Sequence, residues 1–342
     1  MDKSVIFAVA GSGKTSRLVE RLNDEENFLI VTYTDSNYEN LRYKIIQKFG
    51  YFPENITLYT YFRFLHSFCY RPFLRSKNGT KGVTFKLPTS YRYSLKDDRY
   101  YISSSRRLYA NRLAKLIHES NLICAVLARM EKYFDVFLVD EVQDFAGHDF
   151  NFLMAISAAN LNITFVGDFF QHTFDTSRDG NVNRSLHSNY DAYKARFEAA
   201  KLRVDTESLK QSRRCSKSVC DFITEKIGVS IEAHDSRESI VRYEDDPVAV
   251  FAIYNDTNTV KLFYNQHHKY SCYSQNWGMS KGVDWYHDVC VVLNPANVKA
   301  WKNGSFLNIN NQTRNKLYVA CSRARGNLTF VPESVLSNFK RS

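Results

Sequence analysis

The strongest constraint on the fold is a glycine loop that lies between a strand and a helix near residue 10. An apolar run at residues 5–9 leads into Ala8-Val-Ala-Gly-Ser-Gly-Lys-Thr15, and residues 15–22 have a helical pattern. A strand, a glycine loop and a helix in this order are typical of a parallel α/β unit that binds phosphate. The backbone N–H groups of such a loop point at phosphate oxygens, at the positive end of the helix.

The loop residues have distinct expected roles. Lys14 is expected to reach the β- and γ-phosphates of a nucleotide, and the Thr15 hydroxyl to bind Mg²⁺. Gly11 and Gly13 leave the backbone free to approach the phosphates. The nucleotide-binding residues predicted from the loop are Ala10, Gly11, Ser12, Gly13, Lys14 and Thr15.

A second motif combines a buried strand with carboxylates. The apolar residues 136–139 are followed by Asp140-Glu-Val-Gln-Asp144. Asp140 is predicted to bind Mg²⁺ together with Thr15, directly or through water, and to count among the nucleotide-binding residues. Glu141 is predicted to orient and polarise the attacking water. The simpler alternative is a polar strand end.

Short apolar runs alternate with helical patterns along the whole chain. Strands are expected at residues 5–9, 28–32, 56–59, 136–139 and 163–166, and again at 204–209, 248–253, 289–293 and 328–331. A long helical stretch is expected at about 106–132, with further helices at 150–158, 217–227 and 315–323. This alternation favours α/β folding with parallel sheets in two domains, 1–205 and 206–342. Residues 230–275 carry no clear pattern.

Charge is concentrated in one segment. Lys and Arg number 46 and Asp and Glu 36, a net charge of +10, and residues 71–107 hold ten basic residues against Asp97 and Asp98, or +8. The same segment holds six aromatic residues, a mixture suited to single-stranded nucleic acid. A solvated face or a protein-binding surface is the alternative. We treat about 71–130 as a basic insert in the first domain.

Composition also limits the setting of the protein. No apolar run approaches the ~20 residues that span a bilayer, so we expect no membrane association. The seven cysteines include no CxxC pair, which argues against a disulfide framework or a zinc site. A reducing, cytoplasmic location is therefore expected.

Taken together, the motifs resemble those of the UvrD/Rep-type superfamily 1 DNA helicases. Asp140-Glu-Val-Gln-Asp144 is similar to that family's DExQD motif, and Phe165-Val-Gly-Asp-Phe-Phe-Gln171 to its third motif. Three further segments resemble LxxNYRS, SKGLE and YVALTRA: Leu209-Lys-Gln-Ser-Arg-Arg-Cys215, Ser280-Lys-Gly-Val-Asp284 and Leu317-Tyr-Val-Ala-Cys-Ser-Arg-Ala-Arg325. The motifs follow the family's order over residues 5–331.

The resemblance implies two RecA-like domains with ATP in the cleft between them. It makes Gln171 the γ-phosphate sensor, and Arg214 and Arg323 arginine fingers from the second domain, so that the implied catalytic set is Glu141, Gln171, Arg214 and Arg323. It adds Arg213, Gly282 and Asp284 to the residues that bind the nucleotide.

The resemblance also implies contacts with DNA. Val31-Thr-Tyr-Thr-Asp35 is similar to the family's VTFTN element, which implicates Thr34 and Asp35. Thr57-Leu-Tyr59 is similar to its TxH element, and Phe174 lies where relatives often have an aromatic residue near DNA bases. Core packing is the open alternative for Tyr59 and Phe174.

Several family features are missing. The adenine-reading glutamine lies some twenty residues before the loop in relatives, and only a handful of residues precede it here. Arg213 replaces the tyrosine that stacks on adenine, and Gly278 replaces a histidine. The space between Ser216 and Asn276 is too short for the large accessory domain of many relatives. The resemblance therefore indicates a minimal form of the motor.

These features predict an ATP-dependent translocase or helicase on single-stranded or tailed DNA, with 3′→5′ movement. The expected ligands are ATP, with other nucleoside triphosphates (NTPs) accepted, and Mg²⁺. The alternative is a non-processive, DNA-sensing ATPase subunit that serves a protein partner such as a nuclease or a loading factor.

Overall fold

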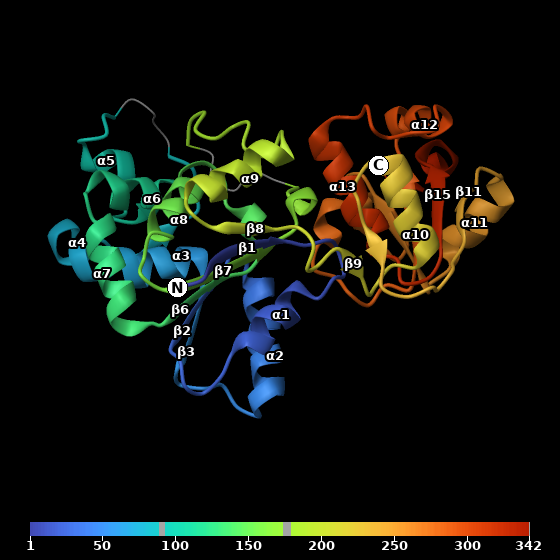
Figure 1. The fold of residues 1–342 in the computed structure, drawn as a ribbon. Helices are drawn as coiled ribbons and strands as arrows, with labels where there is room; N and C mark the ends of the chain where they lie inside the picture. Colours follow the sequence, from blue (N-terminus) through green and yellow to red (C-terminus); the bar gives the residue numbers. More distant parts are fainter. Residues whose placement is uncertain (89–92, 174–178, 342) are drawn as a thin grey trace. The chain divides into compact units, whose positions relative to one another are not determined.

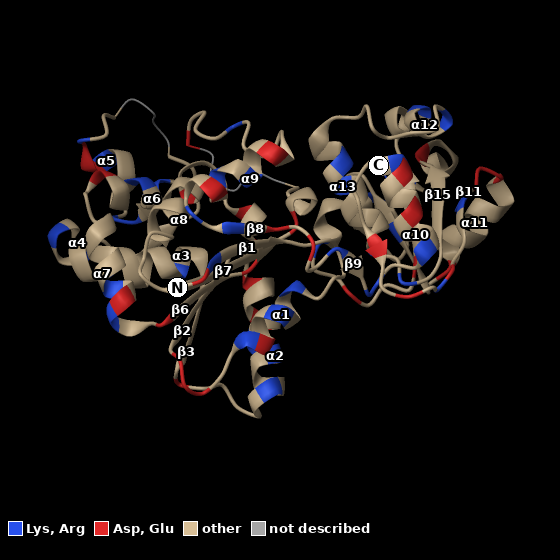
Figure 2. Cartoon of the chain, in the orientation of Figure 1, with Lys and Arg blue, Asp and Glu red and all other residues tan. Residues whose placement is uncertain are grey.

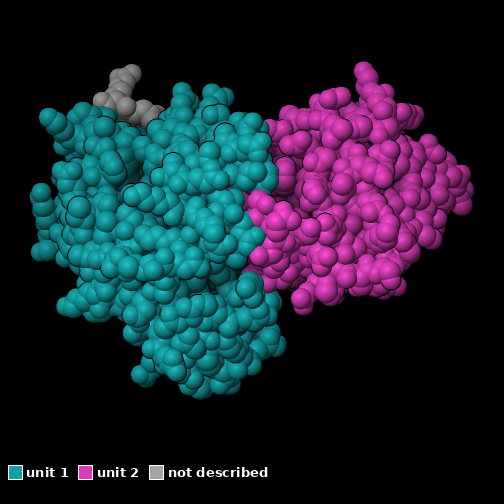
Figure 3. All heavy atoms as spheres, in the orientation of Figure 1, with its two compact units in different colours: residues 1–6, 15–167, 174–205 teal, residues 7–14, 168–173, 206–342 magenta. Residues whose placement is uncertain are grey.

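The computed structural model describes residues 1–88, 93–173 and 179–341. Two compact units make up this part of the chain (Figure 3). Unit 1 consists of Met1–Ile6, Thr15–Gly167 and Phe174–Asp205, and unit 2 of Phe7–Lys14, Asp168–Thr173 and Thr206–Ser342. Two short segments that our division placed in residues 1–205 thus pack with the second half of the chain. A boundary between domains near residue 205 stays a prediction.

Unit 1 is built on a six-stranded sheet with the strand order β3-β2-β6-β7-β1-β8. The strands are β1 (Lys3–Phe7), β2 (Phe28–Thr32), β3 (Ile56–Thr60), β6 (Val136–Val139), β7 (Asn162–Gly167) and β8 (Arg203–Asp205). The pairs β3–β2, β2–β6, β6–β7 and β1–β8 are parallel. Every residue of β2 and β6 is buried, as the unbroken apolar runs predict for central parallel strands.

The helices of unit 1 cover both faces of this sheet. The helices α1 (Lys14–Arg21) and α2 (Asp35–Phe49) lie on one face, and α8 (Gly147–Ile156) and α9 (Tyr190–Ala199) on the other (Figure 1). The strand order explains the division, because right-handed crossovers that run toward opposite edges of a sheet place their helices on opposite faces.

After β3 come α3 (Tyr61–Arg63) and the π-helix η1 (Phe64–Tyr70), which precede the basic insert. The insert, about 71–130, includes α4 (Arg71–Asn78), β4 (Val83–Thr84), α5 (Asp98–Tyr101), β5 (Leu108–Tyr109), α6 (Ala110–Glu119) and most of α7 (Ile123–Tyr133). The single long helix predicted at 106–132 is wrong at its centre. Asn121 has a φ of 56°, which ends the helical path between α6 and α7.

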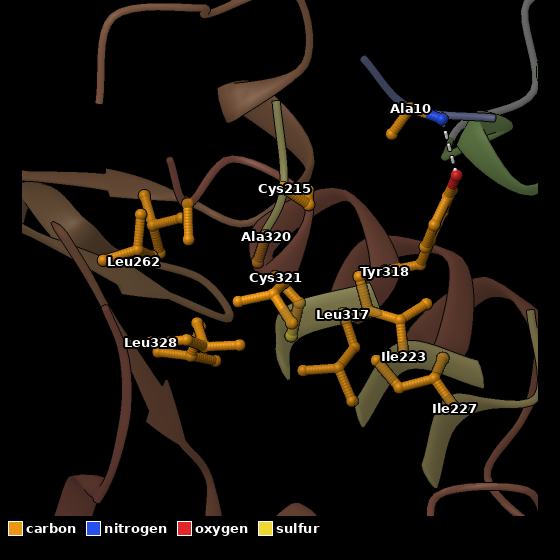
Figure 4. Close-up of a cluster of buried hydrophobic side chains, with 14 of the residues drawn as sticks. Ala10, Cys215, Ile223, Ile227, Leu262, Leu317, Tyr318, Ala320, Cys321 and Leu328 are labelled. Atoms are coloured by element: carbon orange, nitrogen blue, oxygen red, sulfur yellow. Dashed lines mark hydrogen bonds between the residues drawn. The ribbon is translucent and has the colours of Figure 1, made fainter. Parts of the chain in front are cut away.

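Unit 2 is built on a five-stranded parallel sheet with the order β11-β15-β14-β12-β13. The strands are β11 (Val241–Tyr243), β12 (Thr259–Phe263), β13 (Ser274–Asn276), β14 (Asp288–Leu293) and β15 (Leu328–Pro332). Side chains alternate between two cores. Val289 and Val291 of β14 join the larger cluster, part of which Figure 4 shows, whereas Cys290 and Val292 join a cluster on the opposite face.

The remaining elements of unit 2 surround this sheet. They are α10 (Lys217–Phe222), which continues into the π-helix η4 (Ile223–Ile227), α11 (Pro247–Asn255), α12 (Pro295–Lys302) and α13 (Asn311–Cys321), with the two-stranded sheet β9 (Gln211–Ser212) and β10 (Glu232–Ala233). Short 3₁₀ helices are η2 (Val142–Asp144) and η3 (Phe169–Gln171), at the two catalytic motifs, and η5 (His267–Lys269), η6 (Gly278–Ser280) and η7 (Glu333–Phe339).

Two predicted strands are corrected by the structure. Residues 248–253 form α11 and not a strand, because the Asp246 side chain accepts a hydrogen bond from the amide of Ala249 and Pro247 occupies the first turn. The predicted strand at 204–209 is reduced to β8, which pairs with β1 and completes the first sheet instead of starting the second.

The predicted fold class, α/β with two parallel sheets of the RecA-like kind, is confirmed. Within the described ranges, none of the helices has both the length and the apolar character that crossing a bilayer requires.

Candidate functional site

The predicted metal ligands of unit 1 lie side by side. Thr15 stands at the start of α1, and its hydroxyl donates to Asp140 Oδ2 over 3.2 Å. Asp140, at the end of β6, is 2 % exposed, and its Oδ1 accepts from the amide of Glu141 over 3.0 Å. A hydroxyl and a carboxylate are hard oxygen donors, the kind Mg²⁺ prefers, with phosphates and water as its remaining ligands. This donor pair fits the predicted metal.

In the part of the chain that the structure describes, no group of three or more His, Cys, Asp or Glu side chains is arranged to hold an ion. Because Thr15 and Asp140 supply two oxygen donors, most of the coordination of a metal there would come from nucleotide phosphates and water.

The backbone at Glu141 is bent to present its carboxylate. Glu141 has φ 57° and ψ 48°, a left-handed conformation that is uncommon outside glycine. Its carboxylate accepts a hydrogen bond from the amide of Gln143, which is fully buried. Gly167 makes room for that amide, because a Cβ at residue 167 would collide with Gln143 and with Val142. Sequence reasoning assigned no role to Gln143, although it is part of the recognised motif.

In unit 2 the phosphate loop packs against the segment that carries the predicted arginine. The amide of Val9 donates to Leu209 O over 3.0 Å, and the amide of Arg213 donates to Gly11 O over 3.0 Å. Gly11 has φ 75°, and a Cβ there would lie 2.7 Å from both Arg214 Cβ and Ser212 Oγ. Glycine is therefore required at residue 11 by both backbone conformation and space.

Tyr318 connects the phosphate loop to the predicted γ-phosphate sensor. Its hydroxyl accepts from the amide of Ala10 over 2.8 Å (Figure 4) and donates to Asp168 Oδ2 over 2.8 Å. Gln171 Nε2 donates to the same Asp168 oxygen over 2.9 Å. Burial, with the nearby Asp168 carboxylate, raises the pKa of Tyr318, so the hydroxyl keeps its proton. Sequence reasoning missed Tyr318 and Asp168, although both lie inside recognised motifs.

The two predicted arginine fingers converge on one carboxylate. Arg214 forms an ion pair with Asp284 and also donates to Ser322 O over 3.0 Å. Arg323 Nη1 lies 4.0 Å from Asp284 Oδ1 and donates to Val283 O over 3.0 Å. Burial, then the charge of Arg214, lowers the pKa of Arg323 to about 10, so the guanidinium stays charged at neutral pH.

The remaining predicted nucleotide-binding residues of unit 2 differ in exposure. Lys14 and Ser12 are buried, with 8 % and 5 % exposure, whereas the side chain of Arg213 is exposed. Gly282 has φ 83° in the loop before Asp284. The predicted site residues thus fall into two groups. Thr15, Asp140 and Glu141 belong to unit 1, and the other nucleotide-site residues belong to unit 2.

The predicted DNA contacts Thr34 and Asp35 follow the carboxyl end of β2. Thr57 and Tyr59 lie near the start and near the end of β3, which pairs with β2 in parallel. Thr34 caps α2, its hydroxyl accepting from the amide of Asn37, and Asp35 is exposed in the first turn. Thr57 and Tyr59 are half-buried on β3, and the Tyr59 ring lies 6.2 Å from that of Phe64. Phe174 lies outside the described residues.

Basic residues of the insert lie on α4 (Figure 2) and on the turn that follows it. Arg71, Arg75, Lys77 and Lys81 are exposed. Two other basic residues of the segment have structural roles, because Arg106 donates to Asn78 O and Arg107 to Val83 O. Arg92 lies outside the described residues.

Comparison with protein families identifies the class. The model of the viral superfamily 1 RNA helicase core domain matches residues 93–332. The chain therefore belongs to this family, and its class is that of superfamily 1 helicase cores. The predicted resemblance is confirmed at the level of superfamily 1, and the narrower UvrD/Rep assignment stays a prediction.

Solved structures of viral helicases are similar at low identity. The PRRSV helicase is 15% identical with a TM-score of 0.47, and the match covers 97% of this chain and 52% of that one. Arterivirus nonstructural protein 10, a helicase solved in complex with DNA, is 15% identical with a TM-score of 0.49. The match covers 98% of this chain and 63% of that one. A crystal structure of arterivirus nonstructural protein 10 is 16% identical with a TM-score of 0.46. The match covers 96% of this chain and 59% of that one. This chain thus spans between half and two thirds of their length. The comparison with curated proteins gives no match.

Proposed function

We propose that this chain is an NTP-driven motor that moves along, or unwinds, single-stranded or tailed nucleic acid. The observation that carries the proposal is the pairing of Thr15 and Asp140 at 3.2 Å, at the end of a buried strand and beside a glycine loop. ATP is the expected substrate, with other NTPs accepted. Mg²⁺, held by Thr15 and Asp140, would neutralise phosphate charge.

The residues of the chain divide the chemical work. Lys14 and the loop amides bind the β- and γ-phosphates. Glu141 accepts a proton from the attacking water, and Gln171 orients that water against the γ-phosphate. Arg214, released from Asp284, stabilises the negative charge that develops on the phosphoryl oxygens, and Arg323 supports the same charge from its buried position.

The nucleic acid is proposed to contact the ends of β2 and β3 and the basic insert. The resemblance of the motifs to UvrD/Rep helicases supports DNA and 3′→5′ movement, whereas the name of the matched family supports RNA. A role as an ATPase subunit for a partner such as a nuclease or loading factor is the alternative, supported by the small space for an accessory domain between Ser216 and Asn276.

The deciding experiment is steady-state ATP hydrolysis with and without matched single-stranded RNA and DNA oligonucleotides. We expect stimulation by at least one of them, and the stronger stimulator identifies the track. Glu141→Gln should bind nucleotide but lose hydrolysis by orders of magnitude, whereas Lys14→Ala should weaken binding itself. Hydrolysis by Glu141→Gln at the parent rate would refute the proposal.

A strand-displacement assay then distinguishes the proposed motor from the alternative, an ATPase subunit that depends on a partner. Duplexes with a 3′ or a 5′ tail, of increasing length, test polarity and processivity. Unwinding from the 3′ tail alone supports the 3′→5′ motor, and strand-stimulated hydrolysis without displacement of even the shortest duplex supports the partner-dependent alternative.

A further inference from the structure

Asp149 is a buried carboxylate that the chemistry above does not use. It lies in the first turn of α8 and is 0 % exposed. Its Oδ2 accepts from the Tyr33 hydroxyl and its Oδ1 from the Tyr61 hydroxyl, each over 3.2 Å. Each carboxylate oxygen therefore holds one tyrosine.

The two tyrosines also pack against a single phenylalanine. The rings of Tyr33 and Tyr61 are stacked at 5.5 Å, and Phe145 packs edge-on against them at 5.3 Å and 4.8 Å. All four residues of this tyrosine–carboxylate cluster (Tyr33, Tyr61, Phe145 and Asp149) are buried. Close-packed interiors transmit displacement, so movement of one member shifts the others.

The members of the cluster connect the two functional regions of unit 1. Tyr33 follows β2 directly and precedes Thr34 and Asp35, two predicted strand contacts. Tyr61 follows β3, two residues after the predicted contact Tyr59. Phe145 follows η2 and the segment that begins with Asp140 and Glu141. The cluster is therefore the packed junction between the proposed strand-binding edge and the catalytic carboxylates.

The chemistry of Asp149 is costly for a purely structural role. Burial raises the pKa of this carboxyl to about 7, while the hydrogen bonds from Tyr33 and Tyr61 oppose the shift. A buried carboxyl with two neutral donors stabilises a fold poorly, because desolvation offsets the hydrogen bonds. The two hydrogen bonds of Asp149 instead fix the positions of the Tyr33 and Tyr61 hydroxyls, which follow two different strands, relative to α8.

We propose that Asp149 is a positioning residue that couples strand binding at the ends of β2 and β3 to NTP hydrolysis at Glu141. A strand that contacts Thr34, Asp35 or Tyr59 shifts Tyr33 and Tyr61, and the cluster passes the shift through Phe145 to the segment of Asp140 and Glu141. The inference rests on the proposed function, because it gives the route by which nucleic acid stimulates turnover.

The test compares basal and strand-stimulated turnover in two variants. Asp149→Asn keeps the shape but removes the carboxylate, and the double variant Tyr33→Phe/Tyr61→Phe removes only the two hydroxyls. The matched control is Tyr70→Phe, a buried tyrosine at the end of η1 whose hydroxyl pairs with Thr80 over 3.0 Å. Basal turnover, maximal stimulated turnover and the oligonucleotide concentration for half-maximal stimulation are measured for each.

We expect basal turnover to stay within about twofold of the parent in both variants, while the stimulation factor falls by about 5- to 150-fold, the usual range of coupling between two sites. Tyr70→Phe should keep the parent factor. Full stimulation in both variants would overturn the inference, as would an equal fall of basal and stimulated turnover with a lower melting temperature, which indicates a structural role. A parent protein that no oligonucleotide stimulates would overturn the proposed function itself, and the coupling with it.

Discussion

Tyr318 and Asp168 share a hydrogen bond of 2.8 Å, although 150 residues separate them in the chain. The same tyrosine oxygen accepts from the amide of Ala10, and the same carboxylate oxygen accepts from Gln171. One hydroxyl therefore links the phosphate loop to the proposed γ-phosphate sensor. Asn315, also on α13, donates to His172 O over 2.9 Å, so this helix holds the sensor segment at a second point.

Removal of this hydroxyl should be costly. In Tyr318→Phe the amide of Ala10 and the Asp168 carboxylate each lose a buried partner, so the free energy of unfolding should fall by about 1–3 kcal/mol. Turnover should fall as well, because Asp168, which accepts the hydrogen bond from Gln171, loses the Tyr318 hydroxyl that holds it in place. Denaturant unfolding and steady-state hydrolysis measure the two effects. Tyr264→Phe is the control, since its hydroxyl pairs with Thr313 over 3.4 Å, a long hydrogen bond. Equal stability of the two variants would contradict the assigned role.

The shared carboxylate of Asp284 makes Arg214 and Arg323 testable as a pair. If they act as arginine fingers, Arg214→Ala should lower turnover by about 10³- to 10⁵-fold, with a smaller effect on nucleotide binding. Arg214→Lys should not restore the rate, because an ammonium lacks the planar, bidentate geometry. The control is Arg242→Ala, an exposed arginine of β11. Single-turnover hydrolysis and nucleotide affinity are measured, and an Arg214→Ala rate within tenfold of the parent would remove the finger from the mechanism.

Buried parallel strands were the most predictable part of the fold. The bounds of β2 and β6 match the prediction because each is a short, largely apolar run of the kind found in central parallel strands. Residues 248–253 were wrongly predicted as a strand because their apolar run is equally suited to a buried helix. The Asp246-Pro247 pair before it was the signal that could have decided for α11.

The part of the candidate site that could be predicted consists of residues within recognised motifs. Thr15 and Asp140 were predicted to share a metal, and the structure places them 3.2 Å apart. The hydrogen bonds of Tyr318 and the tyrosine–carboxylate cluster around Asp149 could not be predicted. Each depends on side chains from strands and helices that only tertiary packing brings together. Sequence spacing carries no information on such contacts.

Asp149 should also make the free energy of unfolding depend on pH. Its pKa is about 7 in the fold against an ordinary 3.8, so the native state holds the proton to a higher pH than the unfolded chain. The contribution to stability is complete below pH 3.8 and is lost as the pH rises to about 7, by up to about 4 kcal/mol. Burial raises the pKa of Tyr61, one of the two hydroxyls that face Asp149, so that hydroxyl keeps its proton in this range. Unfolding measured from pH 4 to 8 should show this loss in the parent but not in Asp149→Asn. The same slope in both proteins would contradict the raised pKa.

If the basic insert binds nucleic acid, it should contribute to the salt dependence of oligonucleotide binding. Replacement of Arg71, Arg75, Lys77 and Lys81 with Gln should weaken oligonucleotide binding and flatten its salt dependence. The slope of log K against log salt should fall by up to about 0.7 for each lost phosphate contact on a single strand. The control replaces four exposed basic residues of unit 2, Arg242, Lys299, Lys302 and Arg341. An unchanged slope in the insert variant would assign this surface to a protein partner.

The last prediction concerns the base of the nucleotide. The proposed contacts of Lys14, Thr15, Asp140, Gln171 and Arg214 reach phosphate, Mg²⁺ or water, and none of these reports which base is bound. By the resemblance to UvrD/Rep helicases, Arg213 is expected at the place of a stacking tyrosine. Its exposed guanidinium can stack on any base as a planar cation but reads no edge.

Relaxed selectivity should follow. We expect GTP to be used within about tenfold of ATP in kcat/KM, a gap of about 1.4 kcal/mol. Arg213→Tyr should lower KM more for purine than for pyrimidine nucleotides, because larger rings stack over more area, and should leave kcat unchanged, because the phosphates are untouched. Steady-state hydrolysis of the four ribonucleotides by parent and variant measures both effects. A preference for ATP beyond a hundredfold in the parent would mean that other residues of the protein read the adenine edge, and would contradict the prediction.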